Sequence, residues 1–222
     1  MPPHRHSTVK LSPHLERVTD LPRSAHRLAR GGSRDLFLKQ GSLDGACGPY
    51  CVFMAMLGYG LIRRSEINWS SSVDRRTRLG KLMSAIDQHG QFFRDGTDIN
   101  DLKAIIDGSF GNLLSLQPLT STGSKLDQAI IDEVESGHFV CLWMRGRALS
   151  HWVLVVGLET RNEQAHALLA LDPDGREPSL ACWNAVIDLH HSGTGNHRHL
   201  FRPDGRRVRF EAAVGLRLAA KK

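Results

Sequence analysis

The stretch from Cys47 to Leu57 limits the possible folds more than any other part of the chain, because nearly every side chain in it is apolar. A helix that is apolar on all sides cannot face water and has to lie inside the fold. The turn-forming residues 41–45 precede it, and Pro49 suits a first helical turn, where its missing N–H has no intrahelical partner. The sequence therefore predicts a buried central helix that begins at Cys47.

Cys47 is the first candidate for chemistry. At a helix N-terminus the unpaired backbone N–H groups and the helix dipole favour an anion, and the thiolate is the nucleophilic form of cysteine. A free cysteine can instead serve as a small buried hydrophobic residue. Cys51 lies one helical turn further on and is a rival nucleophile.

Three other segments carry the groups that would complete an activated thiol. Gln40 lies seven positions before Cys47, so its side-chain amide can reach over the sulfur as an oxyanion donor. His151 begins a β-branched apolar run, and Asp172 follows a second apolar run, just before a turn. Cysteine, histidine and acid together are what nucleophilic catalysis by a thiol requires.

Other residues compete for these roles. Asp174 lies in the Pro-Asp-Gly turn and is an alternative orienting acid, although it suits the turn itself. Asp44 is a turn residue or an outer partner of the nucleophile. His89 and His138 are alternative bases, but neither is followed by a strand that ends near an acid.

The ordered set resembles the papain-like cysteine peptidases, and most closely the bacterial branch related to the bacteriocin leader-processing, double-glycine peptidases. The resemblance spans about residues 36–175 and rests on Gln40, Asp-Gly-Ala-Cys47-Gly-Pro, His151-Trp-Val-Leu-Val-Val-Gly and Leu-Asp172-Pro. It implies that Gln40 is the oxyanion donor, Cys47 the nucleophile, His151 the general base and Asp172 the orienting acid.

The chain departs from the family pattern at one point. One residue more than usual separates Gln40 from Cys47. Either the intervening loop bulges, or Gln40 is not the oxyanion donor.

The fold class that we expect is α+β. The resemblance implies a papain-like fold, with an N-terminal helical half whose buried helix carries the nucleophile and a C-terminal antiparallel sheet that carries His151 and Asp172. Apolar periodicity predicts helices in residues 78–89, 97–106 and 124–134, the last beginning with a capping box at Ser124 and Asp127. Strand-length apolar runs lie at 139–144, 152–158 and 165–171, with edge strands at 183–188 and 208–218.

Residues 1–34 differ from the rest of the chain. They hold seven Lys and Arg against two acidic residues, which is +5 of the net charge of +6. A segment so poor in apolar residues buries little surface, so we expect residues 1–34 to form a basic, mobile arm and residues 35–222 the catalytic domain. The arm is alternatively a secretion signal, an inhibitory leader, or a contact for nucleic acid or another acidic partner, but it has no aromatic residue for base stacking.

Other function classes find little support in the sequence. No apolar run is long enough for a membrane-spanning helix, and the N-terminus lacks a cleaved secretory signal, so we expect a cytoplasmic protein or one exported without such a signal. The four cysteines have no zinc-site spacing, and disulfides are not expected. No cofactor is implied. A metal site is conceivable only at His190, His191, His197 and His199, where no acid or cysteine completes a known pattern.

The function that we expect is a cysteine peptidase or amidase that cleaves a peptide or isopeptide amide through a thioester. Its partner is a peptide or protein substrate rather than nucleic acid. A deamidase or transamidase effector and a catalytically inactive papain-like binding module are the alternatives, because a fold resemblance does not choose among them.

Overall fold

The computed structural model describes residues 7–15, 36–41, 45–67, 74–88, 96–178, 181–189 and 197–219. Within these residues the helices are α1 (Cys47–Gly58), α2 (Arg78–Gln88), α3 (Ile99–Asp107) and α4 (Ser124–Glu135), with a single 3-10 turn at Arg64–Glu66. The strands are β1 (Ser7–Leu11), β2 (Leu114–Leu119), β3 (Phe139–Gly146), β4 (Leu149–Arg161), β5 (Gln164–Leu171), β6 (Ala185–Asp188), β7 (His199–Phe201) and β8 (Arg206–Leu218).

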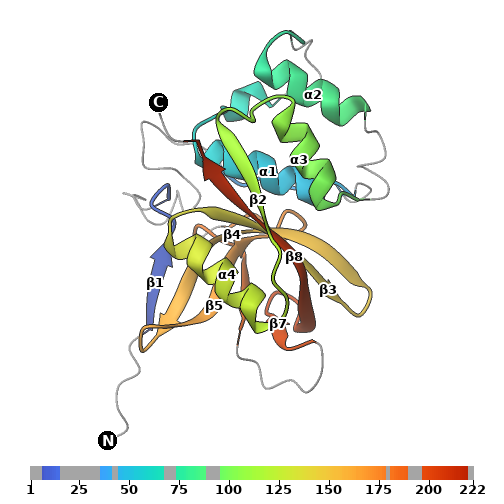
Figure 1. The fold of residues 1–222 in the computed structure, drawn as a ribbon. Coiled ribbons are helices and arrows are strands. Elements are labelled where there is room, and N and C mark those ends of the chain that lie inside the picture. The colour runs from blue at the N-terminus through green and yellow to red at the C-terminus, as the bar shows by residue number, and fades with distance from the viewer. Residues whose placement is uncertain are drawn as a thin grey trace, which may run out of the picture.

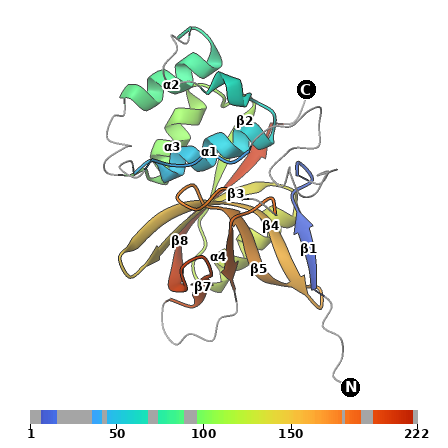
Figure 2. The same cartoon turned by 180° about the vertical axis from the view of Figure 1, so that it is seen from behind.

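Helix α1 is the buried central helix that the sequence predicts. It begins at Cys47, and every residue in it except Tyr50 is buried. Figures 1 and 2 show α1 between the strands below it and helices α2 and α3 above it. The all-apolar composition is explained by this position, because both sides of the helix pack against other elements.

The other helices follow their apolar periodicity. Residues 78–88 and 99–107 are helical as predicted, and the Asp98 side chain accepts a hydrogen bond from the Asp101 N–H at the start of α3. Helix α4 also forms, but the capping box predicted for it at Ser124 is wrong. Gly123 occupies the capping position without a side-chain bond, and Ser124 is the first helical residue.

The strands form one antiparallel sheet that closes on itself. The order β4-β3-β8-β7-β6-β5 returns to β4 through direct pairing of β5 with β4, which makes a closed barrel of six strands. Strand β1 pairs with β4 and β2 pairs with β8 outside this ring. The apolar runs predicted as strands all lie in β3, β4, β5, β6 and β8, whereas β1, β2 and β7 were not predicted.

The predicted papain-like α+β fold class is therefore wrong. The described residues form a mostly-sheet structure of eight strands and four α-helices built around a closed antiparallel barrel. Helices and strands do not divide into an N-terminal and a C-terminal half, since β1 precedes α1 and β2 lies between α3 and α4. Apolar alternation predicts where strands lie, but it does not encode the β4–β5 pairing that closes the barrel.

Alternate residues of the barrel strands contribute to two separate cores. One core contains the side chains of α1, α2 and α3 and those on one face of β3, β4 and β8, including Cys141, Trp152 and Val214. The other contains the opposite face of these strands, the remaining barrel strands and the apolar side of α4. The period of two along a strand explains this division. The face of β4 that belongs to the first core packs directly against α1.

Strand β1 belongs to the segment predicted as an arm. Of residues 1–34 the structure describes only residues 7–15, and these are docked: β1 pairs with β4 from Ser7 to Leu11, and Leu15 is buried in the helical core. A side chain at Gly157 would have its Cβ 2.6 Å from the Lys10 carbonyl oxygen, so glycine allows this close approach. Residues 7–15 of the predicted arm thus lie against the barrel, and the rest of the arm lies outside the described residues.

Helices capable of crossing a membrane are absent from the part of the chain that the structure describes.

Candidate active site

Cys47 lies at the first position of α1, at the contact between this helix and the barrel. Its side chain is 7% exposed, and the first turn of the helix holds no acidic residue that would offset the positive end of the helix dipole. The Trp152 backbone N–H donates a hydrogen bond to the Cys47 sulfur at 3.5 Å. The helix N-terminus and this N–H therefore both present partial positive charge to the sulfur.

His151 reaches the same point from β4. It is the residue before Trp152 and is 8% exposed, and Cys47 is one of the neighbouring groups that raise the pKa of its ring. Its Nε2 lies 2.6 Å from Asp172 Oδ1. Since Nε2 contacts the carboxylate, Nδ1 is the ring nitrogen left to interact with the sulfur. The ring is therefore held by the carboxylate with its Nδ1 available for the sulfur.

Asp172 is held in place by a network that the sequence did not predict. Its N–H donates to Asn184 Oδ1 at 2.6 Å, and Asn184 Nδ2 donates to its carbonyl oxygen at 2.8 Å. The Asp174 N–H donates to Asp172 Oδ1 at 2.9 Å. Asn184 is the functional candidate that sequence analysis missed. It stands just before β6 in no recognisable motif, and only the barrel pairing brings it to Asp172.

The surroundings of His151 favour its protonated form. Burial alone lowers the pKa of a histidine, but the hydrogen bonds and negative charges of Asp172 and Cys47 outweigh burial and raise the pKa of His151 from 6.5 to about 10. The ring is therefore an imidazolium at neutral pH. A cation in contact with a sulfur stabilises the thiolate.

Gln40 lies close to this group. Its backbone N–H donates to the Pro173 carbonyl oxygen at 2.8 Å, which fixes it beside the residue that follows Asp172, and its side-chain Oε1 is buried. Residues 42–44, where the extra residue of the loop would bulge, lie outside the described residues. The structure thus brings Gln40, Cys47, His151 and Asp172 to one end of α1.

The rival residues have other surroundings. Cys51 is completely buried, and this burial, together with the neighbouring Cys141, raises the pKa of its thiol well above the usual value. His138 precedes β3 and lies six positions along that strand from Met144, the partner of His151, which is about 20 Å of extended chain. Asp174 is exposed and supports Asp172 only through its backbone.

Two of the alternatives, Asp44 and His89, lie outside the described residues. So do His190 and His191 of the histidine-rich loop. His199 stacks on Phe210 with ring centroids 3.9 Å apart, and its Nε2 lies 3.3 Å from Asp127 Oδ1. Within the described ranges, no group of three or more His, Cys, Asp or Glu side chains is arranged to hold a metal ion.

Gly48, next to Cys47, allows the segment before α3 to pack closely. A Cβ at this position would lie 2.2 Å from Thr97 Oγ1, with Leu102 and Trp152 at 3.3 and 3.4 Å. We expect Gly48→Ala to lower the free energy of unfolding by about 1 to 3 kcal/mol, as overpacking does. Urea denaturation measures this change.

The double variant Gly48→Ala/Thr97→Ala is the control, because it removes the clashing oxygen and should recover most of the lost stability. If Gly48→Ala is within about 0.5 kcal/mol of the unmodified chain, the close approach is contradicted.

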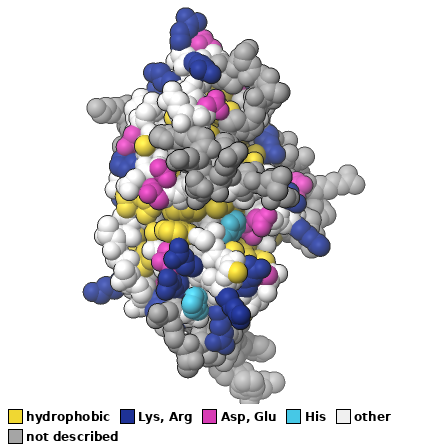
Figure 3. Space-filling view, turned by 90° about the vertical axis from the view of Figure 1, so that its right-hand side faces the viewer, with side chains coloured by type: hydrophobic (Ala, Val, Ile, Leu, Met, Phe, Trp, Pro, Cys, Tyr) yellow, Lys and Arg dark blue, Asp and Glu magenta, His cyan; other side chains and the backbone are white. Residues whose placement is uncertain are grey.

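Figure 3 shows the surface where the helical part of the molecule meets the barrel. A band of hydrophobic side chains crosses this face between the helical part above and the strands below, and it ends beside histidine and acidic side chains. Lys and Arg side chains gather below the band. The face thus has an apolar strip, a polar group and a basic region next to one another.

The chain was also compared with known proteins. No family model matches it, and neither does any curated protein.

Proposed function

We propose that this chain is a cysteine-dependent peptidase or amidase that works through a thioester intermediate. The observation that carries the proposal is the position of the His151 ring, hydrogen-bonded at 2.6 Å to Asp172, directly before Trp152, whose backbone N–H donates to the Cys47 sulfur. The resemblance of these motifs to the papain-like peptidases supports the same roles. The proposal concerns the chemistry of the site and not the papain-like α+β fold.

The proposed resting state pairs a Cys47 thiolate with a His151 imidazolium. The pKa of His151, raised to about 10, keeps the ring protonated at neutral pH. The N-terminus of α1 and the Trp152 N–H both face the sulfur with partial positive charge. Asp172 fixes the ring orientation and stabilises its positive charge.

The oxyanion of the tetrahedral intermediate needs hydrogen-bond donors close to the sulfur. The first N–H groups of α1 have no intrahelical partners and are suitable donors. Gln40 is the proposed side-chain donor, because its backbone bond to Pro173 keeps it beside the group. Each such donor contributes on the order of 3 kcal/mol in comparable enzymes.

The reaction takes two steps. In the first, Sγ of Cys47 attacks the amide carbonyl, the C–N bond breaks, and His151 gives its proton to the departing amine. In the second, water loses a proton to the now neutral His151 and attacks the thioester, which releases the acid and restores the thiolate and imidazolium.

Acylation by p-nitrophenyl acetate tests this proposal, because an activated ester requires little substrate recognition. The expected result is a burst of one p-nitrophenolate per chain, an acetyl group on Cys47 detected by mass spectrometry, and slower turnover. The proposal is overturned if acetylation is spread over Cys47 and Cys182 at equal rates without turnover.

A further inference from the structure

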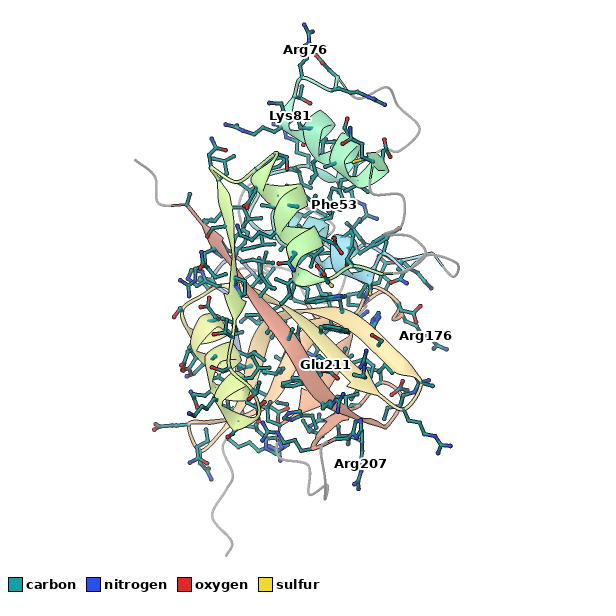
Figure 4. All side chains as sticks on the ribbon, turned by 45° about the vertical axis from the view of Figure 1, so that its right-hand side comes forward. Phe53, Arg76, Lys81, Arg176, Arg207 and Glu211 are labelled. Atoms are coloured by element: carbon teal, nitrogen blue, oxygen red, sulfur yellow. The ribbon has the colours of Figure 1, made fainter. Side chains whose placement is uncertain are left out.

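A second feature of the surface is a basic hollow at the end of the barrel where the β3–β4 and β7–β8 hairpins turn. Its volume is about 710 Å³, and its charged lining, here named the arginine hollow, consists of Arg145, Arg147, His197, Arg206, Arg207 and Arg209. Figure 4 shows Arg207 at the end of the barrel, far from Arg76 and Lys81 at the helical end.

Three of its arginines have a carboxylate close by. Arg206 lies 3.0 Å from Asp204, and Arg209 lies 2.6 Å from Glu211. Arg145 is 3.7 Å from the same Glu211, so two arginines share one acid. In these pairs a guanidinium group lies within ion-pair distance of a carboxylate, as in other Arg–carboxylate pairs.

The remaining charge of the arginine hollow is not neutralised. Arg147 and Arg207 are exposed, and within the described part of the chain their side chains make no ion pair or hydrogen bond. Five arginines therefore face two acids. A surplus of exposed, unpaired guanidinium groups around a concavity is suited to an anionic ligand.

A stack of flat side chains connects the hollow with the candidate nucleophile. The Arg145 guanidinium lies 5.6 Å from the centre of the Trp143 ring, and Trp143 stacks on Trp152 with centroids 5.9 Å apart and planes 21° apart. The Trp152 backbone N–H contacts the Cys47 sulfur, whereas its indole N–H donates to the Thr97 carbonyl oxygen. These two steps span the length of about three to four residues of extended chain.

The strand register gives the same proximity. Arg145 is paired with Ser150, the residue directly before His151, and the Trp143 Nε1 donates to Ser150 Oγ at 3.0 Å. Arg145 therefore lies opposite the residue two positions before Trp152, on the same face of the sheet as the two tryptophans.

We propose that the arginine hollow binds acidic side chains of the substrate, so that the enzyme selects peptides with Asp or Glu a few residues from the amide bond that it attacks. This inference rests on the proposed function. An acidic peptide is favoured over a nucleic acid because the hollow adjoins a group whose chemistry acts on amides. Bidentate pairing of Arg with a carboxylate provides the affinity and fixes the orientation of the bound carboxylate.

The test uses the full chain carrying Cys47→Ala, and binding of labelled probes to it is measured by fluorescence anisotropy. The probes are a labelled peptide of alternating glutamate and glycine, its glutamine counterpart, and a single-stranded oligouridylate. We expect the glutamate peptide to bind about tenfold more tightly than either of the others. Arg147→Glu/Arg207→Glu should reduce this affinity by about tenfold or more.

Arg76→Glu/Lys81→Glu is the matched control, since it changes the net charge equally at the opposite end of the molecule (Figure 4). It should leave the affinity within about twofold. Equal losses in the two double variants, or equal binding of the glutamate and glutamine peptides, would overturn the inference. Tighter binding of oligouridylate would assign the hollow to nucleic acid instead.

The binding assay is independent of the thiol, because Cys47 is replaced in it. Iodoacetamide labelling of Cys47 in Arg147→Glu/Arg207→Glu should proceed at the unmodified rate. Selective peptide binding together with an unreactive Cys47 would contradict the proposed function alone, whereas a reactive Cys47 without selective binding would contradict this inference alone.

Discussion

Cys47→Ala is expected to eliminate the burst with p-nitrophenyl acetate and to lower turnover by about four orders of magnitude or more, to the rate without enzyme. The sulfur is the atom that forms the thioester, and Cys47 is the cysteine among the groups that raise the pKa of His151. The small change in volume should leave the fold intact, which thermal unfolding followed by circular dichroism checks.

Cys182→Ala is the matched control. Cys182 is also buried, at 6% exposure, and burial raises the pKa of its thiol to about 11, so it is protonated at neutral pH. Its replacement should leave burst and turnover unchanged. Retention of more than about a tenth of the turnover by Cys47→Ala would show that another group is the nucleophile.

Asp172→Asn is expected to lower turnover by about two to four orders of magnitude, because the carboxylate that orients and stabilises the imidazolium is lost. The pKa of His151 should fall from about 10, since burial, which lowers it, is then opposed only by Cys47. The proton that the leaving amine needs is present on His151 below this pKa and lost above it. When the pKa falls, the loss of activity at alkaline pH should therefore move to lower pH.

NMR titration of the His151 ring measures the pKa, and the pH profile of turnover on an amide substrate, whose leaving amine needs that proton, measures the shift in activity. Asp174→Asn is the control, because Asp174 supports the group only by its backbone N–H, which the variant retains. It should change turnover by less than about threefold. A pKa for His151 that is the same in Asp172→Asn and the unmodified chain would contradict the assigned role.

The candidate site was more accessible to sequence analysis than the fold. Cys47, His151 and Asp172 each stand at the end of a strongly apolar element, and such elements form where their pattern predicts them. Because residues at the ends of packed elements are fixed by those elements, the three side chains could be expected to meet once α1 was placed against β4 and β5. Asn184 could not be predicted in this way, because its role depends on the pairing of β6 with β5.

The arrangement of the strands depends on interactions that the linear pattern does not contain. Strand β1 has four exposed residues and shows no apolar alternation, and it is located by pairing with β4 beside Gly157. Closure of the barrel depends on register shifts in the β4–β5 pair near Gly157 and Thr160. Bulges of this kind bend strands, and composition alone does not predict them.

The rate of alkylation of Cys47 by iodoacetamide as a function of pH, followed residue by residue by mass spectrometry, tests the central claim most directly. A thiolate held by the His151 imidazolium should react at about pH 6 nearly as fast as at about pH 8.5, and His151→Ala should abolish the reaction at the lower pH. The account is contradicted if the rate at Cys47 rises about tenfold per pH unit, as for an ordinary thiol, and is the same in His151→Ala.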